Sequence, residues 1–198
     1  MKTKRFLDKK QHRLKGFDYS QDGCYFVTTK TKDREHYFGE IVNDKMEMSK
    51  IGQEAHKFWL EIPEHFPFVI LDEFVVMPNH IHGIIIINKN NSITDNLITV
   101  GTQNLVFPLS DFCDLEEYTN KMGSQSQNLS SIVRGFKIGV TKFAKKNKFN
   151  FQWQSRFHDR IIRHIDELDT VRNYIINNPL NWTEDSKNDL STKPLIYF

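Results

Sequence analysis

The sequence contains little cysteine and no long apolar run. Its two cysteines, Cys24 and Cys113, lie far apart and form no C-x-x-C pair among the 198 residues, so no disulfide framework is indicated. The N-terminus lacks the apolar segment of a signal peptide, and runs such as Ile84 to Ile87 are only long enough for a strand. These absences argue against a disulfide-rich secreted domain and a membrane protein, and they predict a cytoplasmic protein.

Charge is nearly balanced in number but unevenly distributed along the chain. There are 27 Lys and Arg residues against 25 Asp and Glu residues, a formal net charge of +2. Residues 2–15 are strongly basic, with Asp8 as their single acid, and residues 130–164 are basic with Asp159 as their single acid. Such clusters favour a polyanionic partner, although runs of this kind also occur on faces that are simply solvated.

The length and the ordinary apolar fraction predict one globular domain with its own core. We expect a basic arm at 1–20, the domain at 21–183 and a tail at 184–198. Within the domain, residues 88–127 are polar and rich in turn formers, which indicates a surface insert.

Hydrophobic periodicity predicts an α+β fold. Strands are expected at 24–32, 36–42, 68–77, 80–87 and 156–163, the first two as a hairpin. Helices are expected at 44–61 with Ser49 as a cap, at 129–147, and from an Asp166 N-cap toward Pro179. The resulting order predicts an antiparallel-rich sheet of about five strands with helices packed against it.

The segment VVMPNHIHGIIII, residues 75–87, places His80 and His82 two residues apart in a strand. Side chains at i and i+2 of a strand share one face, so the two imidazoles converge. Neutral imidazole is the commonest metal ligand, and a metal site is therefore one interpretation. Two hydrogen-bonded histidines at the end of a sheet are the other, and a third ligand would decide between them.

Tyr174 and Asn178 are four residues apart on the last predicted helix and therefore lie on one face. A carboxamide oxygen can be a third ligand beside two imidazoles, and a phenol one turn away can be a nucleophile. The alternatives are a boundary tyrosine with its hydroxyl in water and an ordinary helix end before Pro179.

Two segments together resemble a known family. MPNHIHGIIII resembles the histidine–hydrophobic–histidine signature of HUH endonucleases, and WQSRFHDRIIRHIDELDTVRNYIINNPLNW resembles the tyrosine-helix region of single-tyrosine transposases. Within this group the sequence is most similar to the REP-associated tyrosine transposases. The similarity extends over most of residues 13–183, including RLKGFDYSQDGCYFVT and SSIVRGFKIGVTK, whereas the insert at 88–127 matches no block of the family.

The resemblance implies an HUH, ferredoxin-like sandwich with His80, His82 and Asn178 as ligands of Mg²⁺ or Mn²⁺ and Tyr174 as nucleophile. It further implies cleavage and rejoining of single-stranded or hairpin DNA through a 5′-phosphotyrosine, in DNA transposition, by a monomer or homodimer without a membrane partner. Basic side chains expected to hold DNA phosphates are Arg134, Lys137, Lys142, Lys145, Lys146, Arg156, Arg160 and Arg163.

Two other functions remain open from the sequence. A descendant that binds hairpins without cutting them would need neither the histidines nor Tyr174. A metal-dependent phosphohydrolase that uses water would need the ligands and would tolerate loss of Tyr174.

Overall fold

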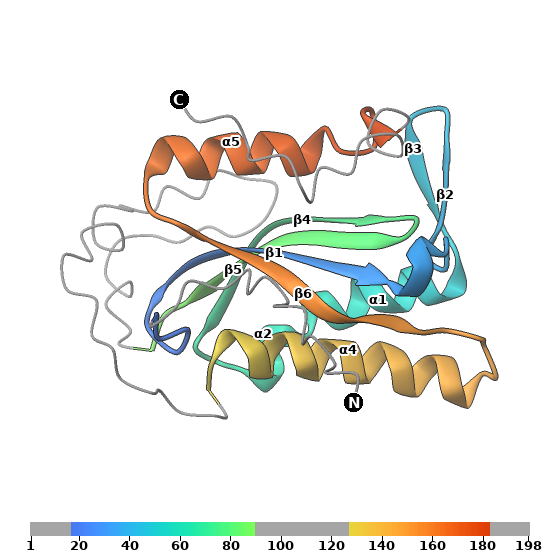
Figure 1. Ribbon diagram of the computed structural model, residues 1–198, viewed down its shortest axis with the longest axis horizontal. Coiled ribbons are helices and arrows are strands. Elements are labelled where there is room, and N and C mark those ends of the chain that lie inside the picture. Colours follow the sequence, from blue (N-terminus) through green and yellow to red (C-terminus); the bar gives the residue numbers. More distant parts are fainter. Residues whose placement is uncertain (1–16, 90–126, 183–198) are drawn as a thin grey trace, which may run out of the picture.

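A computed structural model of the chain describes residues 17–89 and 127–182. Within them one antiparallel sheet separates helix α5 (Ile165–Ile176) from α1 (Lys50–Leu60), α2 (Ile62–His65) and α4 (Leu129–Lys146) (Figure 1). The predicted α+β class is confirmed, and helices cover both faces of the sheet. Cys113, nearly all of the predicted arm and insert, and the tail lie outside the described residues. No helix in the described ranges is long and apolar enough to cross a membrane.

Six strands and one short 3₁₀ helix complete the described secondary structure. The 3₁₀ helix η1 spans Lys32–Arg34. The strands are β1 (Gly23–Thr31), β2 (Gly39–Val42), β3 (Lys45–Met48), β4 (Val69–Met77), β5 (His80–Ile87) and β6 (Trp153–Ile162).

The main sheet has four strands in the order β4-β5-β1-β6, so the first long strand of the chain is central. Val27 of β1 faces Gly83 in β5 and Asp159 in β6. The predicted hairpin between 24–32 and 36–42 is therefore wrong. β2 pairs instead with β3, because Asn43 and Asp44 both adopt positive φ angles, 50° and 60°, which suit a tight two-residue hairpin turn.

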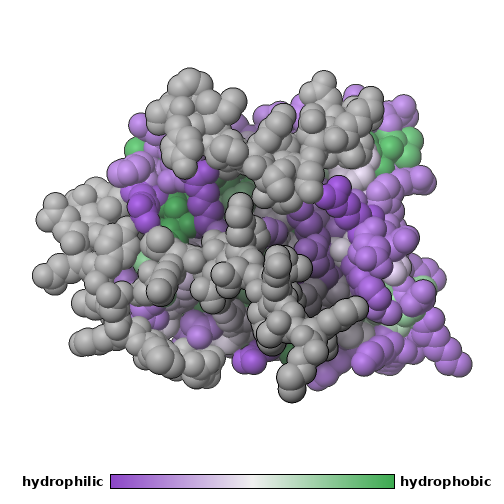
Figure 2. Space-filling model, in the orientation of Figure 1, coloured by the Kyte–Doolittle hydropathy of each residue, from purple (hydrophilic) through white to green (hydrophobic). Residues whose placement is uncertain are grey.

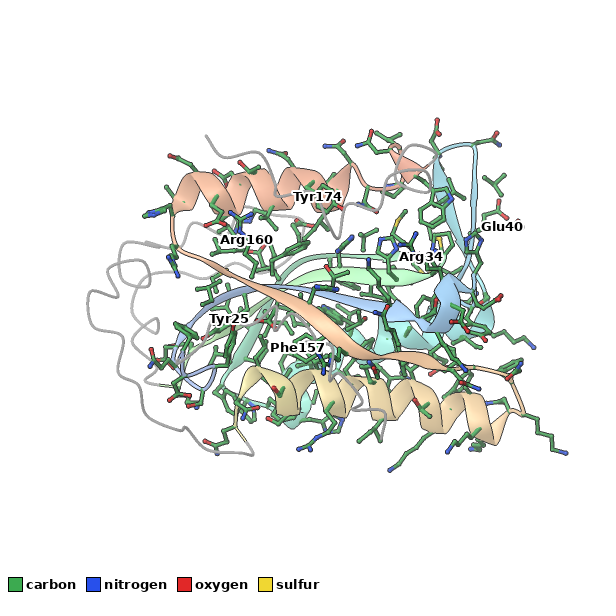
Figure 3. The ribbon with its side chains drawn as sticks, in the orientation of Figure 1. Tyr25, Arg34, Glu40, Phe157, Arg160 and Tyr174 are labelled. Atoms are coloured by element: carbon green, nitrogen blue, oxygen red, sulfur yellow. The ribbon has the colours of Figure 1, made fainter. Side chains whose placement is uncertain are left out.

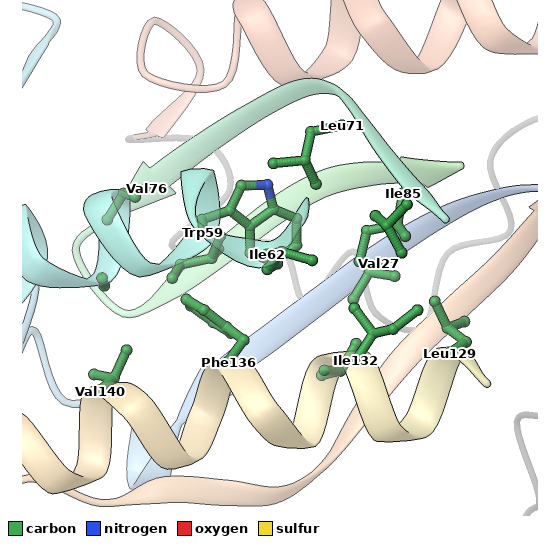
Figure 4. Packing of buried hydrophobic residues seen from close by; sticks show 14 of the residues in the cluster. Val27, Trp59, Ile62, Leu71, Val76, Ile85, Leu129, Ile132, Phe136 and Val140 are labelled. Carbon is green, nitrogen blue, oxygen red and sulfur yellow. The ribbon is translucent and has the colours of Figure 1, made fainter. Parts of the chain in front are cut away.

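Strand alternation divides the side chains of the sheet between two cores. On one face, side chains from β1 and β5 pack against α1, α2 and α4 around Trp59 and Phe136, whose rings are 5.1 Å apart in an edge-to-face arrangement (Figure 4). On the other face, residues of the opposite parity pack against α5. This smaller core contains Cys24, Ile84, Ile86, Ile162, Leu168, Val171 and Ile175.

Gly83 interrupts the isoleucine-rich strand β5 because the indole of Trp59 lies against its backbone. A Cβ atom at position 83 would lie 2.3 Å from Cζ2 of Trp59 and 2.9 Å from Cβ of Phe74. Any larger residue would therefore displace the largest side chain of the core. Packing of Trp59 on the sheet face opposite the histidines therefore requires a glycine at position 83.

Two predicted helix starts differ from the structure. Residues 44–48 belong mostly to β3, and α1 begins only after Ser49, whose hydroxyl accepts the Gly52 N–H at 3.1 Å. Asp166 lies inside α5 and does not cap it, because His164 occupies the N-cap position without a side-chain cap.

Candidate metal and nucleophile site

His80 and His82 project from β5 toward α5, on the face opposite Trp59. Their ring centroids are 4.5 Å apart, and the two residues are only 9% and 7% exposed. Even-numbered residues of β5 share this face, which also carries Ile84 and Ile86 of the smaller core. The structure therefore brings the two histidines together at one buried spot, as the strand period predicts.

Each imidazole is held through its Nδ1 atom. Nδ1 of His80 lies 2.7 Å from Oδ1 of Asn79, and the Asn79 amide donates to the carbonyl oxygen of Arg34 at 3.2 Å. Nδ1 of His82 lies 2.8 Å from the Thr28 hydroxyl on the neighbouring strand β1. Because an amide oxygen only accepts, His80 donates from Nδ1 and its Nε2 carries a lone pair. Hydrogen bonds of this kind orient histidines for metal binding through Nε2.

Tyr174 reaches the same spot from α5. Its hydroxyl lies 3.4 Å from Nε2 of His82, at the long end of the hydrogen-bond range, and the two ring centroids are 5.3 Å apart. The ring of Phe26 stacks on His82 at 5.3 Å and meets Tyr174 edge-on at 6.1 Å. Phe26 thus fixes the distance between the imidazole and the phenol by packing against both.

Asn178 lies beyond the end of α5, so its predicted place on the helix is wrong. The helix ends at Ile176, and the Asn178 N–H instead bonds the Ile175 carbonyl oxygen at 3.2 Å in the following turn. Its side chain is fully buried near His80, and within residues 17–89 and 127–182 neither amide atom has a hydrogen-bond partner of good geometry. A buried carboxamide without a partner costs free energy unless a ligand satisfies it.

Burial keeps both imidazoles neutral. Desolvation, and then the positive charge of Lys30, lowers the pKa of His80 to about 3, and the nearby Asn178 side chain opposes part of that shift. Desolvation also lowers the pKa of His82 well below its usual range, with His80 and Lys30 adding to the effect. Neutral imidazoles are the form that binds metal ions.

The donor set fits a divalent cation. Two Nε2 atoms with fixed partners on their other nitrogens lie beside a buried carboxamide that lacks one, and the region excludes most water. In the described part of the chain, no three His, Cys, Asp or Glu side chains gather as a metal cluster, so a site here depends on the Asn178 oxygen. Such a mixed nitrogen and oxygen set suits Mn²⁺ better than Mg²⁺.

Two ion pairs fix α5 above the sheet. Arg172 donates to both carboxylate oxygens of Asp72, from Nε at 2.9 Å and from an η-nitrogen at 2.5 Å. Asp72 lies where the register of β4 against β5 shifts, between Leu71 and Phe74. Near the start of α5, the Glu167 carboxylate forms an ion pair with Arg160 of β6, in which Oε1 lies 2.6 Å from Nε. These contacts position Tyr174, and sequence periodicity alone could not identify the partners.

The predicted phosphate-binding residues of α4 lie across the sheet from this site. Arg134, Lys142, Lys145 and Lys146 are exposed on α4, which covers the face opposite α5 (Figure 1). Hydrophilic side chains predominate over the end of the molecule that carries β2, β3 and the last turn of α4 (Figure 2). The structure therefore does not bring the α4 cations to the histidines.

Lys137 is engaged within the fold. Its ammonium donates to the carbonyl oxygen of Gln154 at 2.7 Å and lies 5.2 Å from the ring centroid of Trp153. Burial lowers the pKa of Lys137 to about 8. Its side chain connects α4 to β6, which gives Lys137 a structural role in addition to the predicted contact with DNA.

The basic residues of β6 are closer to the site. Arg160 extends from β6 toward α5 on the same side of the sheet as Tyr174, whereas Phe157 points toward α4 (Figure 3). Arg156 is exposed where the register of β6 against β1 shifts, and Arg163 is exposed just beyond the strand. Of the eight predicted phosphate contacts, Arg156 and Arg160 thus lie in β6 and Arg163 directly follows it, whereas the other five lie on α4.

Four residues around the histidines were not predicted to belong to the site. Thr28 and Lys30 are the Cα partners of His82 and His80 across β1, and only the strand register reveals them. Asn79 directly precedes His80, so its position was available to sequence reasoning. Trp182 stacks against His80 at 5.9 Å, with the two planes inclined by 30°.

The fold and site define an α+β sandwich protein in which a strand carries paired histidines beside a helix tyrosine. No protein-family model matches the chain. A protein of Haemophilus influenzae strain Rd, named only as uncharacterised, is 39% identical over 174 residues, covering 87% of this chain and 89% of that protein. The chain belongs to the same family as this Haemophilus protein.

A search of solved structures matched two proteins at low TM-scores. One is a REP-associated tyrosine transposase bound to a REP hairpin, with 15% identity and a TM-score of 0.49, covering 91% of this chain and 87% of that one. The other is a candidate transposase from Deinococcus radiodurans, with 13% identity and a TM-score of 0.36, covering 83% of this chain and 97% of that one.

Proposed function

We propose that the protein is a metal-dependent nuclease and strand transferase of the transposase type, acting on single-stranded DNA, with hairpin-bearing DNA as its substrate. The observation that carries the proposal is the Tyr174 hydroxyl at 3.4 Å from Nε2 of His82, beside His80 and the fully buried Asn178 carboxamide. A nucleophile, two neutral imidazoles and a hard oxygen donor thus share one buried site, as phosphoryl transfer through tyrosine requires.

The chain's own residues would divide the reaction as follows. Tyr174 loses its proton to solvent and attacks phosphorus, so that a tyrosyl oxygen–phosphorus bond forms while the bond from phosphorus to the 3′-oxygen breaks. The departing oxygen takes up a proton and becomes a 3′-hydroxyl. Free phenol has a pKa of about 10 and is a poor nucleophile at neutral pH. A divalent cation held by His80, His82 and Asn178 would supply Lewis-acid polarisation of the phosphate.

The covalent link explains how strands could be rejoined. The phosphotyrosine bond retains the energy of the original phosphodiester, so attack by another 3′-hydroxyl reverses the first step without ATP. Arg156 of β6 and Arg163 directly after it are exposed and would contact phosphates of the bound strand. The cations of α4 would bind DNA farther from the reacting bond, in a manner sensitive to salt.

The test is formation of a covalent adduct with hairpin-bearing single-stranded DNA in Mn²⁺, detected on a denaturing gel and mapped by mass spectrometry. Tyr174→Phe removes one oxygen and preserves the ring against Phe26, so DNA affinity should stay within about twofold while the adduct disappears. Tyr37→Phe is the matched control, because Tyr37 packs against Phe151 in the other core and should leave the adduct unchanged.

The outcomes separate the candidate functions. An adduct on a residue other than Tyr174 would remove this tyrosine from its proposed role. Cleavage without any adduct would favour a phosphohydrolase that uses water. Tight binding of hairpin DNA with no cleavage under any divalent cation would favour a protein that only binds.

A further inference from the structure

Lys30 lies opposite the first histidine of the candidate site. In the register of β1 against β5, Lys30 is the Cα partner of His80, just as Thr28 is the partner of His82. Directly opposed residues of antiparallel strands have Cβ atoms about 4.5–5.5 Å apart and project from the same face. Because Thr28 bonds His82 on the α5 side, Lys30 projects toward α5 as well.

Lys30 lies on the sheet face that carries both imidazoles. His80 and His82 are 9% and 7% exposed, so this face is largely closed to water. The side chain of Lys30 is half-buried, so its field is less screened than that of an exposed lysine.

A lysine in this position is unfavourable for a protein that only binds a cation. Two positive charges that share one partly buried space repel each other. The repulsion is relieved when an anion lies between them, and a phosphate diester can contact an ammonium through one non-bridging oxygen and a metal ion through the other. The arrangement of Lys30 beside the histidine pair therefore fits a bound phosphate.

We propose that Lys30 is a catalytic residue whose ammonium contacts a non-bridging oxygen of the scissile phosphate, across from the His80 and His82 pair. The inference rests on the proposed function, since it names a further residue of the same reaction. In the step itself the tyrosyl oxygen–phosphorus bond forms and the bond to the 3′-oxygen breaks. Lys30 keeps its proton throughout and stabilises the charge that grows on the non-bridging oxygens.

The test uses two measurements that must move in opposite directions. Without DNA, Lys30→Gln should bind Mn²⁺ about threefold to tenfold more tightly, because a repelling charge is removed, as read from free Mn²⁺ by electron paramagnetic resonance. With hairpin-bearing single-stranded DNA and saturating Mn²⁺, the same variant should form the Tyr174 adduct about 100-fold more slowly. If Lys30 had only a structural role, its substitution would weaken Mn²⁺ binding and would also slow adduct formation.

Two further variants complete the experiment. Lys32→Gln is the matched control, because Lys32 is exposed two residues along and bonds Gln152, so both measurements should stay at the wild-type values. Lys30→Arg keeps the charge and should return Mn²⁺ affinity to near wild type and adduct formation to at least ten times the rate of Lys30→Gln.

Several results would overturn the inference. They are unchanged or weakened Mn²⁺ binding by Lys30→Gln, an adduct rate within threefold of wild type, and no recovery with arginine. Failure of the proposed function has a different signature, because the wild-type chain itself would then form no adduct on Tyr174. In that case the catalytic role of Lys30 falls with it, whatever the Mn²⁺ affinities show.

Discussion

The ion pair between Arg172 and Asp72 should be the strongest single polar anchor of α5. The Asp72 side chain is 4% exposed and that of Arg172 is 21% exposed, and the guanidinium donates to both carboxylate oxygens. Removing one partner of a buried pair typically costs about 3–5 kcal/mol, because it leaves an uncompensated charge. Since water can reach the Arg172 end, we expect Arg172→Met to lower the free energy of unfolding by about 2–3 kcal/mol.

Most of the stability lost in Arg172→Met should come from the Asp72 carboxylate, which would be left buried without its partner. Asp72→Asn removes that charge and keeps the shape, and its partner Arg172 can still be solvated, so we expect about 1 kcal/mol. The double variant should therefore be about 1–2 kcal/mol more stable than the sum of the single losses predicts. Urea unfolding followed by tryptophan fluorescence measures all four proteins. Lys57→Met is the control, because the Lys57–Glu61 pair is 66% and 26% exposed and should change stability by about 0.5 kcal/mol or less.

Arg172→Met also tests whether α5 positions the nucleophile. Arg172 lies two residues before Tyr174. Loss of the Arg172–Asp72 ion pair should therefore let α5 move and increase the distance between the Tyr174 hydroxyl and His82. At a temperature where Arg172→Met is fully folded, its adduct formation should fall at least tenfold while DNA affinity is retained. An Arg172→Met loss below 1 kcal/mol, or strict additivity with Asp72→Asn, would refute the reasoning about the buried carboxylate.

Two further substitutions have matched neighbours as controls. Thr28→Val removes the partner of the second histidine and should weaken Mn²⁺ binding about tenfold, as measured by titration calorimetry. Thr29→Val is the control, because its hydroxyl is buried on the other face with no partner in the described ranges and its loss should not weaken binding. Gly83→Ala should lower the unfolding free energy by about 2–4 kcal/mol in urea, since its Cβ would lie 2.3 Å from Trp59. Gly135 lies within α4, and a Cβ atom there would lie 3.4 Å from the ring of Phe66, an ordinary contact. Gly135→Ala should therefore be neutral or stabilising by up to about 1 kcal/mol, because alanine favours the helix more than glycine does.

Sequence periodicity predicted the parts of the fold in which one face is clearly apolar. The strands at 68–77 and 80–87 and the helix at 129–147 are confirmed as β4, β5 and α4, within a residue or so at their ends. The strand at 156–163 is confirmed as β6, although it begins earlier, at Trp153. The buried positions of α4 recur with the helical period, whereas every residue of β5 is buried, so a short apolar run and not an alternation indicated that strand.

The errors arose where the deciding interaction is not local. The strand at 24–32 is correct in place, but its partners lie 50 or more residues away, so adjacency in sequence suggested a hairpin that does not form. At the start of α5, Asp166 has the right residue type for a cap. However, Glu167 accepts the Arg163 N–H and forms an ion pair with Arg160, and the N-cap position falls at His164, two residues before Asp166.

The sequence predicted the residues of the candidate site but not the hydrogen-bond partners that hold its histidines. His80 and His82 follow from the strand period, and Tyr174 follows from the helix that faces them. Asn178 was predicted from its spacing of four residues after Tyr174, but it lies in the turn after α5 and not on the helix. The contacts from Thr28 and Asn79 depend on strand register and on a turn, which a single sequence does not specify.

The strand register of β5 connects the core to the candidate site. Its odd-numbered residues, including Ile81 and Gly83, pack against the core of Trp59, and its even-numbered residues present His80 and His82 to α5. A slip of one residue would turn both imidazoles into the apolar core and place isoleucines beside Tyr174. The contact between Trp59 and the Gly83 backbone opposes such a slip, because any other residue of β5 at that place would collide with the indole. The tight packing on one face of the sheet therefore determines which side chains form the site on the other.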